Sequence, residues 1–295
     1  MAGSDRPAVT DLSRRLGVEG EALQELLAAP YEHYRTAYIR KKNGTRRRLR
    51  VPSDDMKAVQ KAILRTFLTG MDSHPANQCR RGRSVIKNAE LHLGHKWIVA
   101  QDIRNCFPSV RPTMVRRTLQ AFRIEERFIP MLVSLCTLSR QLPQGAPTSP
   151  AILSGVLRSL DEDLTCEADK QGLTYTRYVD DLFVSGNRQF PGYERFLVDA
   201  VNQAGFELAP EKRKKWGPSS PATLAGVVLT TELNPTPEFE RSLSTIVEQV
   251  AARTITLDEE LMAQLRGRIT WMEALSPERA RRIRSKLSSV GGQGV

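Results

Sequence analysis

The stretch "LTYTRYVDDLFVS", Leu173–Ser185, decides the interpretation of this sequence. Apolar and β-branched residues alternate with polar ones around Asp180 and Asp181, which predicts two short strands joined by a tight turn that carries both acids. Carboxylates packed against apolar strands are costly unless a positive charge compensates them, and a bound divalent cation is the usual compensation. The alternative is an ordinary Asp-Asp turn in a hairpin.

A third carboxylate, Asp102, follows another apolar stretch. Residues Lys96–Ala100 predict a buried strand, Asp102 lies just past its apolar part, and Phe107 follows five residues later. Three carboxylates brought together at strand ends can hold two Mg²⁺ ions, which activate an attacking hydroxyl and stabilise the leaving pyrophosphate in phosphoryl transfer. Alternatively, Asp102 caps the next short turn.

The segment "LPQGAPTSP", Leu142–Pro150, predicts a rigid loop, and an apolar helical pattern follows it from Ala151 to Leu164. Gly145 allows a backbone to approach a base or sugar closely, because glycine has no Cβ. We therefore expect Gln144 and Gly145 to line a nucleotide or template pocket. Loops of this composition also precede helices without any such role.

The segment "YIRKKNGTRRRLRVP", Tyr38–Pro52, predicts a basic hairpin with its turn at residues 42–45. Guanidinium groups bind phosphate oxygens in pairs, so we expect Arg46 and Arg47 to contact a triphosphate. The sequence does not decide which of Arg46, Arg47 and Arg48 faces the nucleotide. The alternative is a solvated basic turn or a nonspecific nucleic-acid patch.

The order of these motifs along the chain resembles that of the reverse transcriptases, from about Tyr34 to Leu233. The resemblance implies an α+β right-hand polymerase fold, with fingers, a palm made of an antiparallel sheet with helices, and a helical thumb. The expected domains are an N-terminal helical segment (1–37), fingers (38–95), a palm with a fingers insertion (96–233) and a thumb (234–295).

The same resemblance implies an RNA-directed DNA polymerase that uses deoxynucleoside triphosphates and two Mg²⁺ ions. The catalytic metal ligands would be Asp102, Asp180 and Asp181. Phe107 would be a steric gate, because an aromatic ring under the sugar leaves no room for a 2′-hydroxyl; alternatively it is a core aromatic.

Three further residues receive roles from the resemblance. Tyr178 and Val179 would lie beneath the primer end. The segment "APEKRKKW" resembles the lysine-bearing segment of the family, in which Lys212 would protonate the leaving pyrophosphate; alternatively Lys212 is an exposed phosphate contact.

A narrower resemblance points to the retron reverse transcriptases. The element "NAELH", Asn88–His92, matches their Asn-Ala-x-x-His motif, and the tail "LRGRITWMEALSPERARRI" is similar to theirs. This resemblance implies that Asn88 and His92 bind RNA. Where these enzymes carry Val-Thr-Gly, the chain has Leu224-Ala225-Gly226, which keeps the glycine, an expected primer or template contact.

The retron resemblance also implies partners and a product. A cognate structured non-coding RNA would supply both the template and the priming 2′-hydroxyl, and the product would be a branched RNA–DNA hybrid, msDNA. The family is associated with defence against phage, usually beside a separate effector protein. Two alternatives stay open: another bacterial reverse transcriptase (diversity-generating, abortive-infection or group II intron type), or a non-polymerising nucleic-acid-binding module of the same fold.

The charge of the chain agrees with a polyanionic partner. The net charge is +11 and the isoelectric point about 9.8. In the predicted helical tail, Arg279, Arg282 and Lys286 recur at spacings of three and four, so they share one face of a helix. We expect this face to bind RNA phosphates, although basic faces are also simply solvated.

The cysteines and the hydropathy indicate the compartment. Cys79, Cys106, Cys136 and Cys166 form no CxxC pair, which is typical of reduced thiols in a cytoplasmic protein. No signal peptide is evident and no apolar run approaches transmembrane length, so no membrane association is expected.

Overall fold

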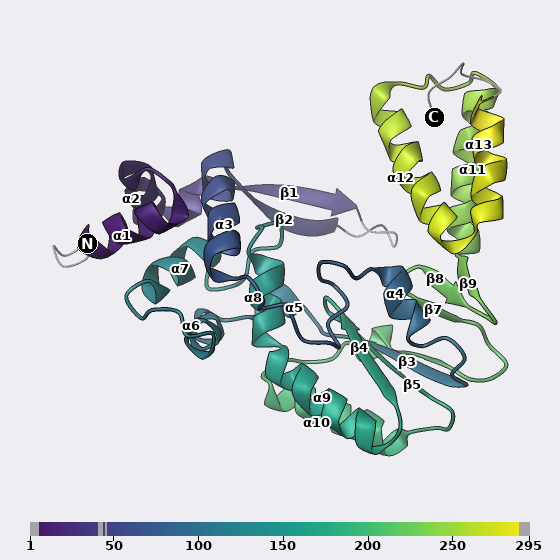
Figure 1. Ribbon diagram of the computed structural model, residues 1–295, viewed down its shortest axis with the longest axis horizontal. Coiled ribbons are helices and arrows are strands. Elements are labelled where there is room, and N and C mark those ends of the chain that lie inside the picture. Colours follow the sequence, from purple (N-terminus) through teal and green to yellow (C-terminus); the bar gives the residue numbers. More distant parts are fainter. Residues whose placement is uncertain (1–5, 41–43, 45, 289–295) are drawn as a thin grey trace.

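A computed structural model describes residues 6–40, 44 and 46–288 of the protein. Figure 1 shows the N-terminal helices at one end of the molecule and three C-terminal helices at the other, with a sheet and its helices between them. The turn predicted at residues 42–45 lies outside the described residues except for Gly44. The mixture of helices and antiparallel sheets confirms the expected α+β class.

The palm sheet is antiparallel and has the strand order β4-β5-β3-β6. Its strands are β3 (Trp97–Asp102), β4 (Thr174–Tyr178), β5 (Asp181–Gly186) and β6 (Lys214–Trp216). The predicted hairpin is confirmed, with Val179 and Asp180 in its turn and Asp181 as the first residue of β5. Helices α9 (Arg158–Lys170) and α10 (Pro191–Gln203) lie side by side along this sheet (Figure 1).

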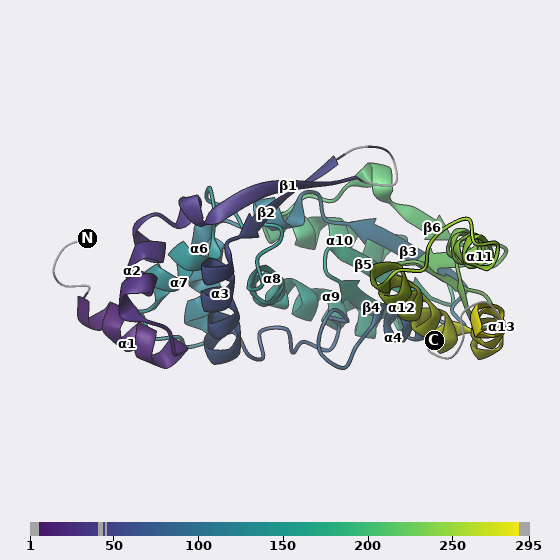
Figure 2. The ribbon, with the colours of Figure 1, turned by 90° about the horizontal axis from the view of Figure 1, so that it is seen from above.

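The fingers hairpin consists of β1 (Tyr34–Arg40) and β2 (Arg46–Pro52) and extends from the N-terminal helices toward the thumb (Figure 2). Helix α3 (Asp54–Phe67) follows it and begins where the Ser53 side chain accepts a hydrogen bond from the backbone N–H of Met56. The other elements of this half are α1 (Arg6–Leu16), α2 (Gly20–Ala28), η1 (Pro30–His33), α4 (Val85–Glu90), α5 (Cys106–Ser109), α6 (Pro112–Ala121), α7 (Ile129–Cys136) and α8 (Ser149–Val156).

One hydrophobic core runs from Val9 in α1 through the fingers to Leu208 beyond α10. Its members on α3, such as Met56, Val59 and Ile63, recur at the helical period, as the sequence pattern indicates. The predicted domain limits at residues 37 and 95 stay predictions, since this core passes through both.

The helical pattern predicted from Ala151 to Leu164 is confirmed, but it forms two helices, α8 and α9, which meet at Leu157. Leu157 is fully buried, and its backbone ψ of 0° turns the chain between the two helices. The break allows Leu153 on α8 and Leu164 on α9 to enter the same core. An apolar repeat cannot reveal a turn of one residue, because the repeat continues on both sides of it.

The thumb is a three-helix unit with its own core. A small sheet, β7 (Ala222–Leu224), β8 (Val227–Leu229) and β9 (Leu233–Pro235), joins it to the palm, and η2 (Pro210–Lys212) precedes β6. The helices are α11 (Pro237–Ala251), α12 (Glu259–Leu275) and α13 (Pro277–Ser288), and the helix breaks at Ser276, before a proline. Leu243, Ile269 and Ile283 bring one side of each helix together. In the part of the chain that the structure describes, no helix has the length and hydrophobicity needed to cross a membrane.

Candidate active site

The three predicted carboxylates lie at one end of the palm sheet. Asp102, the last residue of β3, is paired in register with Asp181, the first residue of β5. The backbone N–H of Ile103 donates to the carbonyl oxygen of Asp180 at 3.0 Å, which fixes the turn beside β3. All three acids line one cavity of about 700 Å³. The structure therefore brings together residues that lie almost eighty positions apart in the sequence.

Burial and repulsion make two of these carboxylates, Asp180 and Asp181, difficult to ionise. Burial, followed by the charges of Asp180 and Asp102, raises the pKa of Asp181 to about 7. Burial and the charge of Asp102 also raise the pKa of Asp180, while Arg47 and Lys212 act in the opposite direction. Carboxylate oxygens are the hard donors that Mg²⁺ prefers, and a bound cation would favour the ionised form of these acids.

Lys212 holds one of these acids. Its Nζ lies 2.7 Å from Oδ1 of Asp102, although the lysine side chain is 54% exposed. Among residues 6–40, 44 and 46–288, no group of three or more His, Cys, Asp and Glu side chains forms a preassembled metal cluster. The lysine ammonium compensates part of the negative charge that a divalent cation would otherwise compensate. The oxygens of the three carboxylates are therefore of the type that holds a cation, and Lys212 donates a hydrogen bond to one of them, Oδ1 of Asp102.

The cavity also contains most of the predicted nucleotide and primer residues. Phe107 on α5 and Gln144, together with Tyr178 and Val179, line it beside the acids. Other lining residues were not predicted, among them Leu49, Lys57, Val85 and Ala225. They come from β2, α3, α4 and the β7–β8 turn. No sequence motif marks Lys57 or Val85 as a site residue, because only tertiary packing brings these elements together.

Gly145 lines the cavity, and its backbone also lies close to the backbone of Arg50 on β2. Its φ is +121°, and a Cβ placed on it would lie 3.0 Å from the backbone oxygen of Arg50. The backbone N–H of Arg50 donates to the carbonyl oxygen of Gln144 at 2.8 Å. The close approach that requires glycine is therefore to β2 of the fingers hairpin, and it joins that hairpin to the loop.

The register of the fingers hairpin separates its arginines onto two faces. Arg47 is paired with Ile39, whereas Arg46 is paired with Arg40. Successive side chains of a strand point to opposite faces, and Arg47 and Leu49 are the β2 residues that line the cavity. Arg46 therefore lies on the face turned away from the acids, which favours Arg47 for the nucleotide contact; both contacts stay predictions.

Asn88 and His92 are buried, which corrects the expectation that they bind RNA. Both are 0% exposed. The two ring nitrogens of His92 lie 2.7 Å from the hydroxyls of Ser185 and Thr176, and Thr176 donates to Oδ1 of Asn88 at 2.6 Å. Burial lowers the pKa of His92 to about 3, so the ring is neutral. These residues attach α4 and the turn after it to β4 and β5.

The β7–β8 turn reaches the active-site cavity through Ala225. Ala225 and Gly226 have φ values of +47° and +94°, a pair that tight two-residue hairpin turns require. The glycine of Leu224-Ala225-Gly226 therefore has a backbone conformation that favours glycine. Its contact with primer or template stays a prediction.

In the thumb, Arg279, Arg282 and Lys286 line one groove of about 230 Å³ between α11 and α13. This confirms that they share a helix face. Nη1 of Arg279 lies 3.0 Å from Oε2 of Glu240 across the groove. The groove therefore has a net excess of cations and one internal ion pair.

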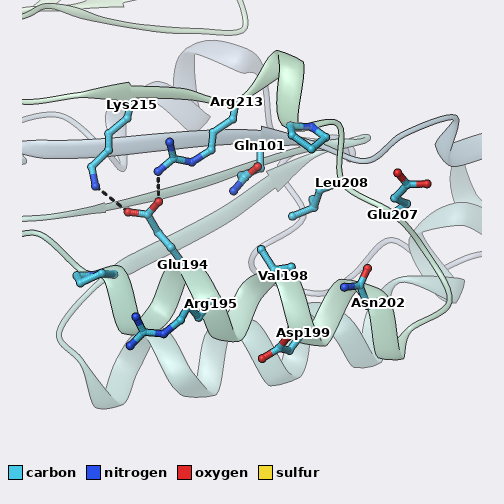
Figure 3. Close-up of a pocket in the computed structure, with 12 residues that line it drawn as sticks. Gln101, Glu194, Arg195, Val198, Asp199, Asn202, Glu207, Leu208, Arg213 and Lys215 are labelled. Carbon is cyan, nitrogen blue, oxygen red and sulfur yellow. Dashed lines mark hydrogen bonds and ion pairs between the residues drawn. The ribbon is translucent and has the colours of Figure 1, made fainter.

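A second large cavity, of about 710 Å³, lies between α10 and the β3–β6 edge of the sheet (Figure 3). The carboxylate of Glu194 there pairs with both Arg213 and Lys215, so its negative charge is compensated by neighbouring side chains. None of the predicted catalytic residues lines this cavity. The two cavities have similar volumes, but only the first is lined by Asp102, Asp180 and Asp181, and it is therefore the candidate active site.

The chain is similar to known reverse transcriptases. The family model described as reverse transcriptase (RNA-dependent DNA polymerase) matches residues 39–229, which include all three carboxylates. The Retron Mx65 reverse transcriptase of Myxococcus xanthus is 31% identical over 92% of this chain and 69% of its own length. The Retron Ec86 reverse transcriptase of Escherichia coli is 29% identical over 75% of this chain and 71% of its own length. The chain therefore belongs to the reverse transcriptase family of RNA-dependent DNA polymerases, and within it to the retron reverse transcriptases.

Solved telomerase structures share the fold. Telomerase from Candida albicans, in complex with a fragment of telomeric RNA, has a TM-score of 0.53 at 11% identity. Apo telomerase from Candida tropicalis has a TM-score of 0.57 at 10% identity. This chain spans only 59% and 58% of those chains, respectively. At these identities the likeness concerns the fold alone, and it confirms the right-hand polymerase architecture.

The raised pKa of Asp181 predicts how stability depends on pH. Its usual pKa of 3.8 applies to the unfolded chain, and its folded value is about 7. The unfolded chain therefore ionises first, so this group stabilises the metal-free protein fully below pH 3.8 and loses that effect as pH rises to about 7. We expect Asp181→Asn to unfold at a higher temperature than wild type at pH 8 in EDTA, with the difference shrinking toward pH 4.

Thermal unfolding of both proteins across this pH range, with and without Mg²⁺, measures the effect. Mg²⁺ should raise the unfolding temperature of wild type more than that of the variant, since the variant lacks one carboxylate ligand. A difference between the proteins that does not change with pH would show that Asp181 ionises normally.

Proposed function

We propose that this chain copies a cognate structured RNA into DNA by nucleotidyl transfer that depends on two Mg²⁺ ions. The observation that carries the proposal is the convergence of Asp102, Asp180 and Asp181 in the cavity that also holds Phe107 and Arg47. When bound, the two ions would activate the primer hydroxyl and stabilise the charge that develops on the leaving pyrophosphate. The three carboxylates would hold them.

The remaining residues of the cavity would bind and orient the substrates. Arg47 would bind the triphosphate, because its guanidinium is on the inner face of the hairpin. Phe107 would lie under the sugar, and Tyr178 with Val179 would support the primer end. Lys212, whose ammonium already reaches the carboxylate site, would hold a proton near the leaving pyrophosphate.

Loss of one carboxylate tests the central proposal. We expect Asp180→Asn to lower primer extension by at least about 10³-fold, because metal ligation supplies several kcal/mol of barrier reduction and each ~1.4 kcal/mol is tenfold. RNA affinity should stay near the wild-type value, since binding depends on scattered cations rather than on these acids. Primer extension and filter binding measure the two quantities. Near-wild-type synthesis by a folded Asp180→Asn protein would refute polymerisation at this site.

The two faces of the fingers hairpin provide a matched pair of variants. We expect Arg47→Ala to raise the KM for deoxynucleoside triphosphates by roughly 10–100-fold, the effect of removing one or two charge-assisted hydrogen bonds. Arg46→Ala removes the same charge from the outer face and should leave the KM unchanged. Single-nucleotide incorporation kinetics measure both. Equal effects of the two substitutions would show that the hairpin acts only through its total charge.

The steric-gate proposal predicts a change in sugar selection. We expect Phe107→Val to raise incorporation of ribonucleotides relative to deoxyribonucleotides by at least about tenfold, because the smaller side chain leaves space for a 2′-hydroxyl. Phe196→Val, which truncates a partly buried core aromatic on α10, is the control. If an active Phe107→Val protein keeps the wild-type preference for deoxyribonucleotides, Phe107 is a core aromatic and not a steric gate.

We further propose that the thumb groove binds the cognate RNA. A-form RNA is held mainly through phosphates and 2′-hydroxyls, which suits a row of cations on one helix face. Charge reversal at Arg279, Arg282 and Lys286 should weaken RNA binding. It should also reduce the salt dependence of binding by roughly one unit of slope for each RNA phosphate that the variant no longer neutralises.

Charge reversal at Arg241, Arg268 and Arg281, which lie on α11, α12 and α13 outside the groove, is the control with the same change in net charge. Binding titrations at several salt concentrations measure affinity and slope together, and circular dichroism checks that the thumb helices remain folded. If both variants show the same fall in affinity, the groove has no special role.

We infer the product and partners of this chain from its relatives, which are named retron reverse transcriptases. The RNA would supply the template and a priming 2′-hydroxyl, and the product would be msDNA, a branched RNA–DNA hybrid. The enzyme would act in the cytoplasm in defence against phage, with a separate effector protein. Sequencing the nucleic acid that co-purifies with the protein tests this: a covalent 2′-branch supports it, whereas an unbranched product favours another class of bacterial reverse transcriptase.

A further inference from the structure

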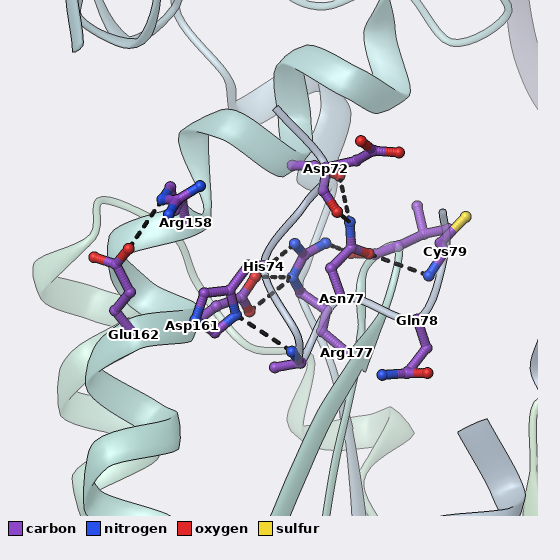
Figure 4. A network of polar contacts seen from close by, with 12 residues as sticks. Asp72, His74, Asn77, Gln78, Cys79, Arg158, Asp161, Glu162 and Arg177 are labelled. Carbon is purple, nitrogen blue, oxygen red and sulfur yellow. Dashed lines mark hydrogen bonds and ion pairs between the residues drawn. The ribbon is translucent and has the colours of Figure 1, made fainter. Parts of the chain in front are cut away.

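A fully buried ion pair joins α9 to β4, the strand that leads into the turn with Asp180 (Figure 4). The side chains of Arg177, on β4, and Asp161, on α9, are only 1% and 0% exposed. Nε of Arg177 donates to Oδ1 of Asp161 at 2.9 Å, and Nη2 donates to Oδ2 at 2.7 Å. This two-point contact fixes the plane of the guanidinium group.

The third nitrogen of the guanidinium contacts the catalytic turn itself. Nη1 of Arg177 donates to the carbonyl oxygen of Val179 at 2.9 Å. Val179 has a φ of +60°, a conformation that β-branched residues rarely adopt. Such a backbone persists only where the surrounding structure holds it, and the guanidinium is one of the groups that hold it.

Both peptide groups that flank Asp180 are therefore anchored. The carbonyl on its N-terminal side belongs to Val179 and is held by Arg177. The carbonyl on its C-terminal side is held by the backbone N–H of Ile103 at 3.0 Å, next to Asp102 on β3. With both peptide planes fixed, the direction in which the Asp180 side chain leaves the backbone is fixed as well.

Further contacts hold the ion pair in place. The hydroxyl of Tyr175 donates to Oδ1 of Asp161 at 2.9 Å. The backbone N–H of Arg177 donates to Ala76 and its carbonyl accepts from Gln78, both at 2.8 Å. The residue between them, Asn77, is itself buried and contacts Ser154 at 3.1 Å. The segment around Asn77 thus holds the backbone of Arg177, while Asp161 on α9 holds its guanidinium.

Stability alone is a poor explanation for this pair. Removing two charges from water is costly, and well-packed apolar side chains of similar volume often stabilise a core as well as a buried ion pair does. An apolar pair, however, has no donor for the carbonyl of Val179. A lysine has one ammonium group and does not reproduce the fixed fork that contacts Asp161 and Val179 together.

We propose that Arg177 is a positioning residue, which Asp161 orients so that its guanidinium holds the Val179–Asp180 peptide and directs Asp180 toward Asp102 and Asp181. This proposal rests on the proposed polymerase function. The ion pair touches neither nucleotide nor metal ligand side chain; it acts through the backbone of the turn.

A double substitution separates positioning from stability. Arg177→Met or Asp161→Leu alone leaves a buried charge without its partner and should destabilise the protein strongly. The double variant Arg177→Met/Asp161→Leu removes both charges, so its unfolding temperature should lie well above that of either single variant. Its kcat should nevertheless stay about 10²-fold low, the effect of a small misplacement of a reacting group.

Three readouts distinguish the roles in the double variant. RNA affinity and the KM for deoxynucleoside triphosphates should match wild type, whereas the Mg²⁺ concentration for half-maximal activity should rise several-fold, because the carboxylates no longer converge. A stable double variant with wild-type kcat and Mg²⁺ dependence would overturn the proposal. If the double variant does not fold, Arg177→Lys takes its place: a folded lysine variant should show the same fall in kcat, and full activity would overturn the proposal.

Tyr193→Phe is the matched control. Tyr193, on α10, donates a buried hydrogen bond to the carbonyl oxygen of Leu164 on α9 at 2.8 Å, in the same core but away from the turn. Its removal should lower the unfolding temperature and leave kcat and the Mg²⁺ dependence unchanged. An equal fall in kcat would mean that any weakening of this core impairs synthesis, which would overturn the positioning role. Wild-type protein without polymerase activity would instead refute the proposed function.

Discussion

Electrostatic repulsion among three carboxylates is the constraint on which the rest of the structure depends. The register of β3 against β5 places Asp102 beside Asp181, and burial removes the water that would screen their charges. The consequence is a pKa of about 7 for Asp181. A folded chain that holds acids in this way needs a compensating cation and a rigid support. Lys212 forms an ion pair with Asp102, and hydrogen bonds from Arg177 and Ile103 hold the turn on two sides.

Strand β4 supplies much of that support because it is anchored by polar side chains on both of its faces. Thr176 points toward α4 and joins the network of Asn88 and His92. Tyr175 and Arg177 point to the opposite face and contact Asp161. Apolar packing alone tolerates small shifts of a strand, whereas buried hydrogen bonds and ion pairs have strict distance and angle requirements. The strand that leads into the turn with Asp180 is therefore placed by directional contacts.

The periphery of the molecule serves the same cavity. The fingers hairpin reaches it through Arg47 and Leu49 and is tied to its loop by the contact between Arg50 and Gln144. The β7–β8 turn reaches it from the thumb side through Ala225. The thumb helices have a separate core, so the basic groove between α11 and α13 is built independently of the catalytic centre. This arrangement suits an enzyme that must bind a long RNA and also place one nucleotide accurately.

The sequence by itself determined the elements and their chemistry. The alternating pattern around Asp180 and Asp181, the acid after the next apolar strand and the basic hairpin each follow from local periodicity and residue type, and the order of motifs identified the family. Only the tertiary structure decided that Arg47 rather than Arg46 faces the acids, that Asn88 and His92 are buried, and that Arg177 supports the turn. These depend on strand register and on contacts between distant segments, such as Arg177 with Asp161 and Gly145 with Arg50, for which local periodicity carries no information.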